Sequence, residues 1–245
     1  MPECFPPPLA IPFEMAWILA AVTVISLWAI SLWRVLCGFS CFPSKPAFLP
    51  SSGSGKKRNV LLVVAHPDDE SMFFAPTILF LTSEGHNLHI LCMSTGNAEG
   101  VGNVRKEELY RACVVLKIPL QHVKILDHPE LQDGFNNRWD HKLLSTIIED
   151  EIKIMLLSDN SQRNMEAWEL ISTSILRKYS GPVDIWFSIL CSLSSGRQMY
   201  CIPNSLPRKS YLAMAEHESQ WVWFRKLFVL FSSYTYTNTL RKINF

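Results

Sequence analysis

The sequence has no excess of charge of either sign. Of its 245 residues, 23 are Lys or Arg and 22 are Asp or Glu, so the formal net charge at pH 7 is +1. Domains that bind nucleic acid through its phosphates usually carry a marked positive excess. The charge balance therefore gives no general case for a nucleic-acid partner. The length allows one sizeable domain with an appendage, and no pattern sets an oligomeric state.

Cysteine is present but lacks the spacing of a disulfide framework. The seven cysteines are irregularly placed, and Cys92, Cys113 and Cys191 lie inside apolar runs. Free cysteine in such runs behaves as a small apolar side chain. We therefore predict reduced core thiols, which suits a domain that faces the cytosol.

Charge is absent from one long run near the N-terminus. Residues 15–33 contain no Asp, Glu, Lys or Arg, and a run of that length can cross a hydrocarbon core of about 30 Å as a helix. A cleaved signal peptide is the alternative, but it requires basic residues before the apolar run. Here the basic residues all follow it. We predict an irregular tail over 1–12 and a transmembrane signal anchor over 13–36.

The charges that flank this run predict its orientation. Glu3 and Glu14 precede it, and five basic residues follow: Arg34, Lys45, Lys56, Lys57 and Arg58. By the positive-inside rule, the C-terminal part of the chain faces the cytosol. Residues 37–57 are rich in Pro, Gly and Ser, which predicts a flexible linker before one domain over 58–245.

A strand-like apolar run, residues 60–64, ends abruptly in the residues AHPDDE at 65–70. A short run rich in Val and Leu is typical of a strand buried on both faces of a parallel sheet. Ligands of such sheets bind outside the carboxyl ends of the strands. Further strand-like runs at 88–93, 122–126 and 152–157 alternate with helical patterns at 104–116 and 139–150. We predict the α/β class, with a Rossmann-like, mostly parallel sheet and flanking helices.

The polar residues after the first run have the chemistry of a metal site. An imidazole and a carboxylate are ligands that zinc takes, so we predict His66 and Asp69 as ligands of zinc or another divalent cation. Asp68 leaves the same turn in another direction and is the predicted base toward a metal-bound water. The alternative is a solvated acidic loop at the start of a helix. That alternative explains the carboxylates but not the His-Pro pair at the end of a buried strand.

Residues 65–70 resemble the signature of the LmbE-like family of zinc-dependent de-N-acetylases. Residues 213–220 and 223–225 also resemble a C-terminal pattern of this family. The resemblance implies hydrolysis of an N-acetyl amide. It also implies a lipid-linked amino-sugar substrate, N-acetylglucosaminyl-phosphatidylinositol, in an early step of GPI-anchor biosynthesis. The expected location is the endoplasmic reticulum membrane, crossed once, with the catalytic domain in the cytosol.

The resemblance also points to four residues around the substrate. Arg105 and Glu108 match an Arg followed three residues later by Glu, which either contacts the substrate head group or forms a surface ion pair. Asp127 opens a polar loop at the same sheet edge, which in the family helps to shape the sugar site. His217 matches a family position near the site, although a lone histidine on a helix is more often structural.

One part of the family pattern is missing. The family carries a His-x-x-His pair after the fourth strand, which supplies the third metal ligand and the general acid, but this chain has no histidine between His141 and His217. His86 and His89 have the spacing but lie at the opposite end of the sheet and point to opposite faces. We expect residues 151–175 to be divergent or shortened.

Three functions remain open at this point. The main prediction is the de-N-acetylase, and the first alternative is a catalytically impaired, membrane-anchored isoform or pseudoenzyme. The second alternative, an amidohydrolase of soluble sugars, is disfavoured by the anchor and by the aromatic stretch Trp221–Phe231. That stretch either packs in the core or lies in a membrane interface.

Overall fold

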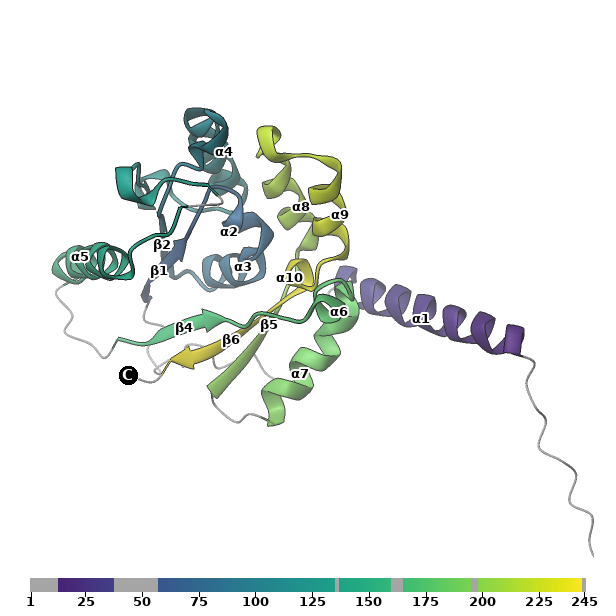
Figure 1. Ribbon diagram of the computed structural model, residues 1–245. Helices are drawn as coiled ribbons and strands as arrows, with labels where there is room; N and C mark the ends of the chain where they lie inside the picture. Colours follow the sequence, from purple (N-terminus) through teal and green to yellow (C-terminus); the bar gives the residue numbers. More distant parts are fainter. Residues whose placement is uncertain (1–12, 38–56, 135–136, 160–164, 195–197, 244–245) are drawn as a thin grey trace, which may run out of the picture.

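The computed structural model describes residues 13–37, 57–134, 137–159, 165–194 and 198–243 (Figure 1). The predicted tail and all but the ends of the predicted linker lie outside these residues. The helices and strands are α1 (Phe13–Leu36), β1 (Asn59–Val64), α2 (Asp69–Met72), α3 (Ala75–Ser83), β2 (Asn87–Cys92), α4 (Gly102–Val115), β3 (Val123–Ile125), α5 (His141–Asp159), β4 (Ala167–Leu170), α6 (Ile175–Lys178), α7 (Asp184–Ser194), β5 (Met199–Pro203), α8 (Pro207–Ala215), α9 (Trp223–Phe231), α10 (Ser233–Tyr236) and β6 (Thr237–Ile243). The short 3₁₀ turns are η1 (Asn97–Glu99), η2 (Leu120–His122), η3 (Pro129–Leu131), η4 (Gly181–Val183) and η6 (Glu218–Gln220).

The first half of the domain is built on a parallel sheet in the order β1-β2-β3. Asn59 pairs with Asn87 and Val64 pairs with Cys92, so β1 and β2 end level with each other. The carboxyl end of β1 leads directly into the turn that holds His66. This confirms the predicted α/β class and the first three strands.

Alternate side chains of β2 face two different layers. Leu88, Ile90 and Cys92 are buried in the core formed with α3 and α4, whereas Leu91 and Met93 pack against α5. Side chains alternate in this way along every strand. Figure 1 shows α5 on one side of the sheet and α3 and α4 on the other. The sheet is therefore the middle layer of three, with helices packed on both of its faces.

The predicted strand at 152–157 is wrong. These residues continue α5, which runs without a break from His141 to Asp159. No Gly or Pro interrupts the segment, and Leu, Met, Ile, Lys and Glu are compatible with a helix. Its apolar side chains do not form a buried face, since Ile154 is 56% exposed and Leu157 is 80% exposed. Part of the divergent segment 151–175, residues 160–164, lies outside the described residues.

A second, antiparallel sheet in the order β4-β6-β5 was not predicted. Ile202 of β5 and Leu240 of β6 join the same core as α3 and α4. Buried Asn238 of β6 links this sheet to the segment after the candidate site, because its Oδ1 accepts from Thr77 Oγ1 at 2.7 Å and its Nδ2 donates to the Phe73 carbonyl at 2.8 Å. The two sheets therefore share one core.

Helix α1 is the one apolar helix within the described ranges that is long enough to cross a membrane. Its span, Glu14–Leu36, has 23 residues and a mean hydropathy of 2.1. Its N-terminal part extends away from the domain, and its C-terminal end meets the domain between α9 and α7 (Figure 1). The predicted apolar N-terminal helix is present with nearly the expected bounds.

Candidate active site

The turn after β1 holds an aspartate in a rare backbone conformation. Asp68 has φ 112° and ψ −26°, in the left-handed region that residues other than glycine seldom adopt. Its N–H donates to Glu70 Oε2 at 3.0 Å, and its side chain is almost fully buried. Strained backbone of this kind persists only where its surroundings hold it, and it is frequent at functional sites.

Two arginines face the carboxylate of Asp68. Arg225 Nη1, from α9, contacts Asp68 Oδ2 directly, and Arg105 Nη2, from α4, lies 3.5 Å from the same oxygen. Burial raises the pKa of Asp68 above its ordinary value, and the positive charges of Arg225 and Arg105 oppose that rise. The site therefore holds a buried carboxylate whose basicity is increased by desolvation and moderated by two cations.

His66 presents a buried ring nitrogen with no hydrogen bond in the described part of the chain. This atom, Nε2, lies 3.3 Å from Asp133 Oδ1, and the imidazole ring packs 5.6 Å from the ring of Trp139. A buried nitrogen that lacks a hydrogen-bond partner is costly unless something else satisfies it. Metal binding is one such role for an imidazole.

Asp69 lies on the same turn as His66 and organises its backbone. Asp69 Oδ2 accepts from the N–H groups of Ala65 and His66, at 3.1 and 2.9 Å, and lies 3.9 Å from His66 Nδ1. Burial, with the nearby charge of Asp68, raises the pKa of Asp69 to about 6. The structure thus brings the three predicted chemical residues, His66, Asp68 and Asp69, onto one turn at the carboxyl end of β1.

A buried ion pair supports this turn from behind. Glu70 and His217 are both fully buried, and His217 Nε2 lies 2.7 Å from Glu70 Oε1. Burial alone would raise the pKa of Glu70 and lower that of His217, but their mutual attraction reverses both shifts. Glu70 also holds the backbone of Asp68. His217 therefore reaches the turn through Glu70 and has no exposed surface.

The other predicted substrate residues occupy different places. Arg105 lies in the site, where it donates to the carbonyls of Gly96 and Pro67, each at 2.9 Å. Glu108, one turn further along α4, is buried, and its two oxygens accept from the N–H and the hydroxyl of Ser219. The surface ion pair considered for Arg105 and Glu108 is therefore wrong, because both side chains are buried and each has other partners.

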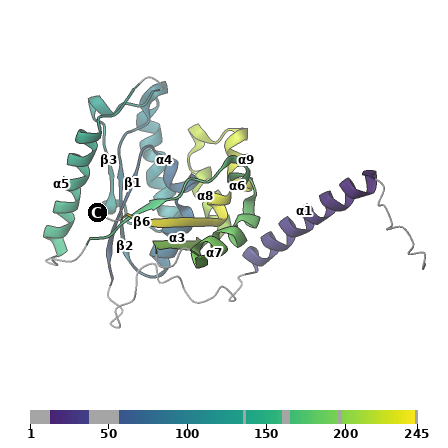
Figure 2. The same ribbon diagram turned by 60° about the horizontal axis from the view of Figure 1, so that its bottom comes forward.

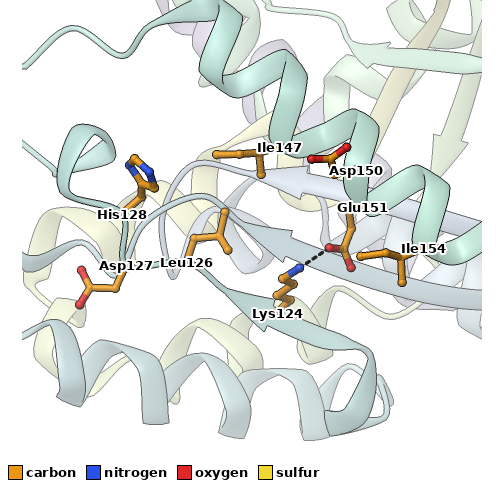
Figure 3. A pocket seen from close by; sticks show the side chains of 8 residues that line it. All are labelled: Lys124, Leu126, Asp127, His128, Ile147, Asp150, Glu151 and Ile154. Atoms are coloured by element: carbon orange, nitrogen blue, oxygen red, sulfur yellow. Dashed lines mark hydrogen bonds and ion pairs between the residues drawn. The ribbon is translucent and has the colours of Figure 1, made fainter.

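Asp127 lies at a separate hollow of about 330 Å³ between β3 and α5 (Figure 3). The ion pair between Lys124 and Glu151 spans part of this hollow. None of the residues of the His66–Glu70 turn lines it. The hollow is thus distinct from the turn.

Two side chains on the turn, His66 and Asp69, are of the types that bind metal ions. A ring nitrogen without a hydrogen bond and a neighbouring carboxylate have the chemistry that zinc prefers. Among the residues that the structure describes, however, no group of three or more His, Cys, Asp or Glu side chains is arranged to hold a metal ion. Asp133 and Arg225 are the site neighbours that the sequence interpretation missed. Their only signals were the polar loop after β3 and the C-terminal family pattern.

Comparison with known proteins identifies the family. Residues 61–158 match the family described as "PIG-L: GlcNAc-PI de-N-acetylase". The N-acetylglucosaminyl-phosphatidylinositol de-N-acetylase of Bos taurus is 34% identical over 245 aligned residues, covering 86% of this chain and 94% of that protein. The chain belongs to the PIG-L family.

Two further relatives extend the likeness beyond mammals. Proteins named as probable N-acetylglucosaminyl-phosphatidylinositol de-N-acetylases are 31% identical in Dictyostelium discoideum and 34% identical in Schizosaccharomyces pombe. The matches cover 76% and 78% of this chain and 94% and 91% of those proteins. As a PIG-L family member, this chain is a de-N-acetylase, a hydrolase of amide bonds.

Proposed function

We propose that the protein removes the acetyl group of N-acetylglucosaminyl-phosphatidylinositol, releasing acetate and glucosaminyl-phosphatidylinositol, in an early step of GPI-anchor biosynthesis. The observation that carries the proposal is the turn after β1, where Asp68 is buried beside His66 and Asp69. The names of the PIG-L relatives support this substrate.

Asp68 is the proposed general base. It would accept the proton of the attacking water while Arg105 and Arg225 keep its carboxylate in place. His66 and Asp69 would hold zinc or another divalent cation, which when bound polarises an amide carbonyl and lowers the pKa of a water molecule. Arg105, which is at the turn, would contact the sugar or phosphate group of the substrate.

The remaining predicted residues have supporting roles in the proposal. Glu108 would position Ser219, and through it the segment that follows α8. His217 would keep Glu70 ionised and thereby fix the backbone of Asp68. Asp127 would act at the edge of the sugar site through its loop, since its Oδ1 accepts from Gln132 Nε2 at 3.1 Å.

Helix α1 is the proposed membrane anchor. Its length and hydropathy support a single crossing, and the basic residues after it support a cytosolic domain. A lipid-linked substrate in the cytosolic leaflet of the endoplasmic reticulum would then lie on the same side as Asp68. Confocal localisation together with protease protection of the C-terminus tests this arrangement.

Complementation tests the catalytic proposal. Cells that lack the endogenous de-N-acetylase should regain glucosaminyl-phosphatidylinositol when they express this chain. Asp68→Asn should abolish the gain, and Asp150→Asn, on the exposed surface of α5, should keep it. No gain from the unaltered chain, together with no bound zinc in the purified protein, would instead favour the non-catalytic alternative.

A further inference from the structure

The C-terminal third of α1 is packed against the domain. Trp186 Nε1 of α7 lies 3.1 Å from Ser31 Oγ, and the ring of Trp28 lies 6.1 Å from the ring of Phe231 at the end of α9. Val35 is buried with residues of α7 and α10. The domain therefore packs against α1 along residues 28–35.

The part of α1 that precedes these contacts, residues 14–27, is too short to cross a bilayer by itself. Every residue from 14 to 27 is exposed, and at 1.5 Å per residue this part extends about 20 Å. The hydrocarbon core is about 30 Å thick. If α1 crosses the core completely, as proposed above, about 10 Å of the crossing must be made by residues 28–35, which pack against the domain.

The two helices beside this contact, α7 and α9, expose many large apolar side chains. Leu190 of α7 is 63% exposed and Trp223 of α9 is 73% exposed. The other large apolar side chains exposed on these helices are Trp186, Phe187, Leu193, Phe224, Leu227, Leu230 and Phe231. We call the exposed apolar side chains of α7 and α9 the α7–α9 surface.

This surface is continuous with the membrane helix. In Figure 1, α9 lies above and α7 below the inner end of α1, and Figure 2 shows α1 leaving the domain beside α7. Interfacial helices commonly bury their apolar faces about 5–10 Å into a leaflet. That depth is close to the length of about 10 Å that residues 14–27 of α1 lack. Insertion of the domain to this depth would therefore complete the crossing of α1 and also cover the exposed apolar side chains.

We propose that the α7–α9 surface is embedded in the cytosolic leaflet around α1, so that the domain sits partly within the bilayer. The proposal rests on the membrane crossing of α1 proposed above. The occupant is lipid, because the surface adjoins a helix that already requires lipid contact and because clustered exposed apolar side chains mark a contact site. The embedded surface would place the α9 helix, which carries Arg225, at lipid level.

Photo-crosslinking of the full-length protein in vesicles tests the proposal. The photoreactive residue p-benzoylphenylalanine is placed in turn at Leu190 and Leu227. Val22, within the exposed residues 14–27 of α1, is the positive control. The vesicles contain phosphatidylcholine with an alkyne-tagged acyl chain. Two exposed apolar positions on helices away from α1, Val114 of α4 and Ile154 of α5, serve as negative controls.

The outcomes separate this proposal from the anchor proposal. Lipid adducts at 190 and 227 as abundant as those at 22, with none at 114 and 154, are expected. Adducts at 22 alone would show that the anchor is correct and the embedded surface is wrong. No adduct at 22 would overturn both, and adducts of double mass at 190 or 227 would assign the surface to a second copy of the chain.

Discussion

Arg225 reaches the carboxylate of Asp68 across 157 residues of sequence. One nine-residue helix, α9, therefore supplies a partner of the proposed base and also carries exposed apolar side chains such as Trp223 and Leu227. The turn at residues 66–70 and the C-terminal family pattern meet at this contact. The contact explains why residues near both ends of the domain belong to one site.

Replacement of Arg225 should reduce turnover without unfolding the domain. A hydrogen bond to a charged group contributes about 2 kcal/mol, which corresponds to a loss of about thirtyfold in kcat for Arg225→Ala. Arg225→Lys should recover part of it, because the positive charge returns. Steady-state kinetics on the glycolipid check this, with exposed Lys226→Ala as the control. Equal activity of Arg225→Ala and Lys226→Ala would exclude a positioning role.

His66→Ala should abolish stoichiometric metal binding. The side chain removed is the one that places a buried nitrogen without a hydrogen bond at the turn, and loss of one ligand weakens a metal site strongly. Elemental analysis of the purified protein after dialysis measures the metal directly. His128→Ala, on the loop after β3, is the matched control. Retention of one zinc per chain in His66→Ala would remove His66 from the ligand set.

Asn238→Ala should destabilise the domain far more than Asn87→Ala. Asn238 is buried, and its loss leaves the Phe73 carbonyl and the Thr77 hydroxyl without their partner. Each buried polar group left unpaired costs about 1–3 kcal/mol. Asn87 lies on the surface, and among the described hydrogen bonds its side chain makes only one, from Nδ2 to Asn59 Oδ1 at 2.9 Å. Urea unfolding compares the two variants, and similar midpoints would contradict the assigned role.

Gly181→Ala should weaken the packing of the domain against α1 at Trp28. Gly181 has φ +60°, and an added Cβ would lie 2.9 Å from Trp28 Nε1. Gly85→Ala is the matched control, because Gly85 has φ +76° with nothing within 4 Å of the added Cβ. Both variants carry a backbone cost of about 1 kcal/mol, but only Gly181→Ala adds the clash. Thermal unfolding should show a larger decrease in melting temperature for Gly181→Ala. Equal decreases for the two variants would mean that the Trp28 side chain moves aside at no cost.

Acidification should destabilise the fold through His89. Burial and the positive charge of His122, which stacks 4.0 Å away, lower the pKa of His89. The unfolded chain then binds this proton more readily, so stability is complete above the ordinary pKa of about 6.5 and falls as pH drops below it. His122→Phe keeps a stacked ring without the charge. Its melting temperature should fall less than that of the wild type between about pH 7.5 and about pH 5.5.

The first half of the domain was predictable because its signals are local. The runs at 60–64 and 88–93 lie within one residue of β1 and β2, and the expected helix at 104–116 overlaps α4. A short continuous apolar run and a helical repeat are both patterns that short windows detect. The motif at 65–70 predicts where the candidate site lies, because it follows directly from the end of β1.

The second half was less predictable because long-range contacts define it. Strand β4 pairs with β6, so that Ala167 lies opposite Ile243, and no local pattern encodes a pairing over such a separation. The run at 152–157 has the composition of a strand, yet it continues α5 in the absence of a helix breaker. Arg225 likewise belongs to the candidate site only through the tertiary contact between α9 and Asp68.

The packing of the domain against α1 also affects how the substrate would reach the enzyme. A protein on a loose tether samples a volume above the bilayer, whereas one fixed to its anchor by Trp28 and Ser31 keeps a constant height and tilt. Glycolipids would then arrive by lateral diffusion in two dimensions. Turnover would follow the surface density of the glycolipid in the leaflet and not its bulk concentration.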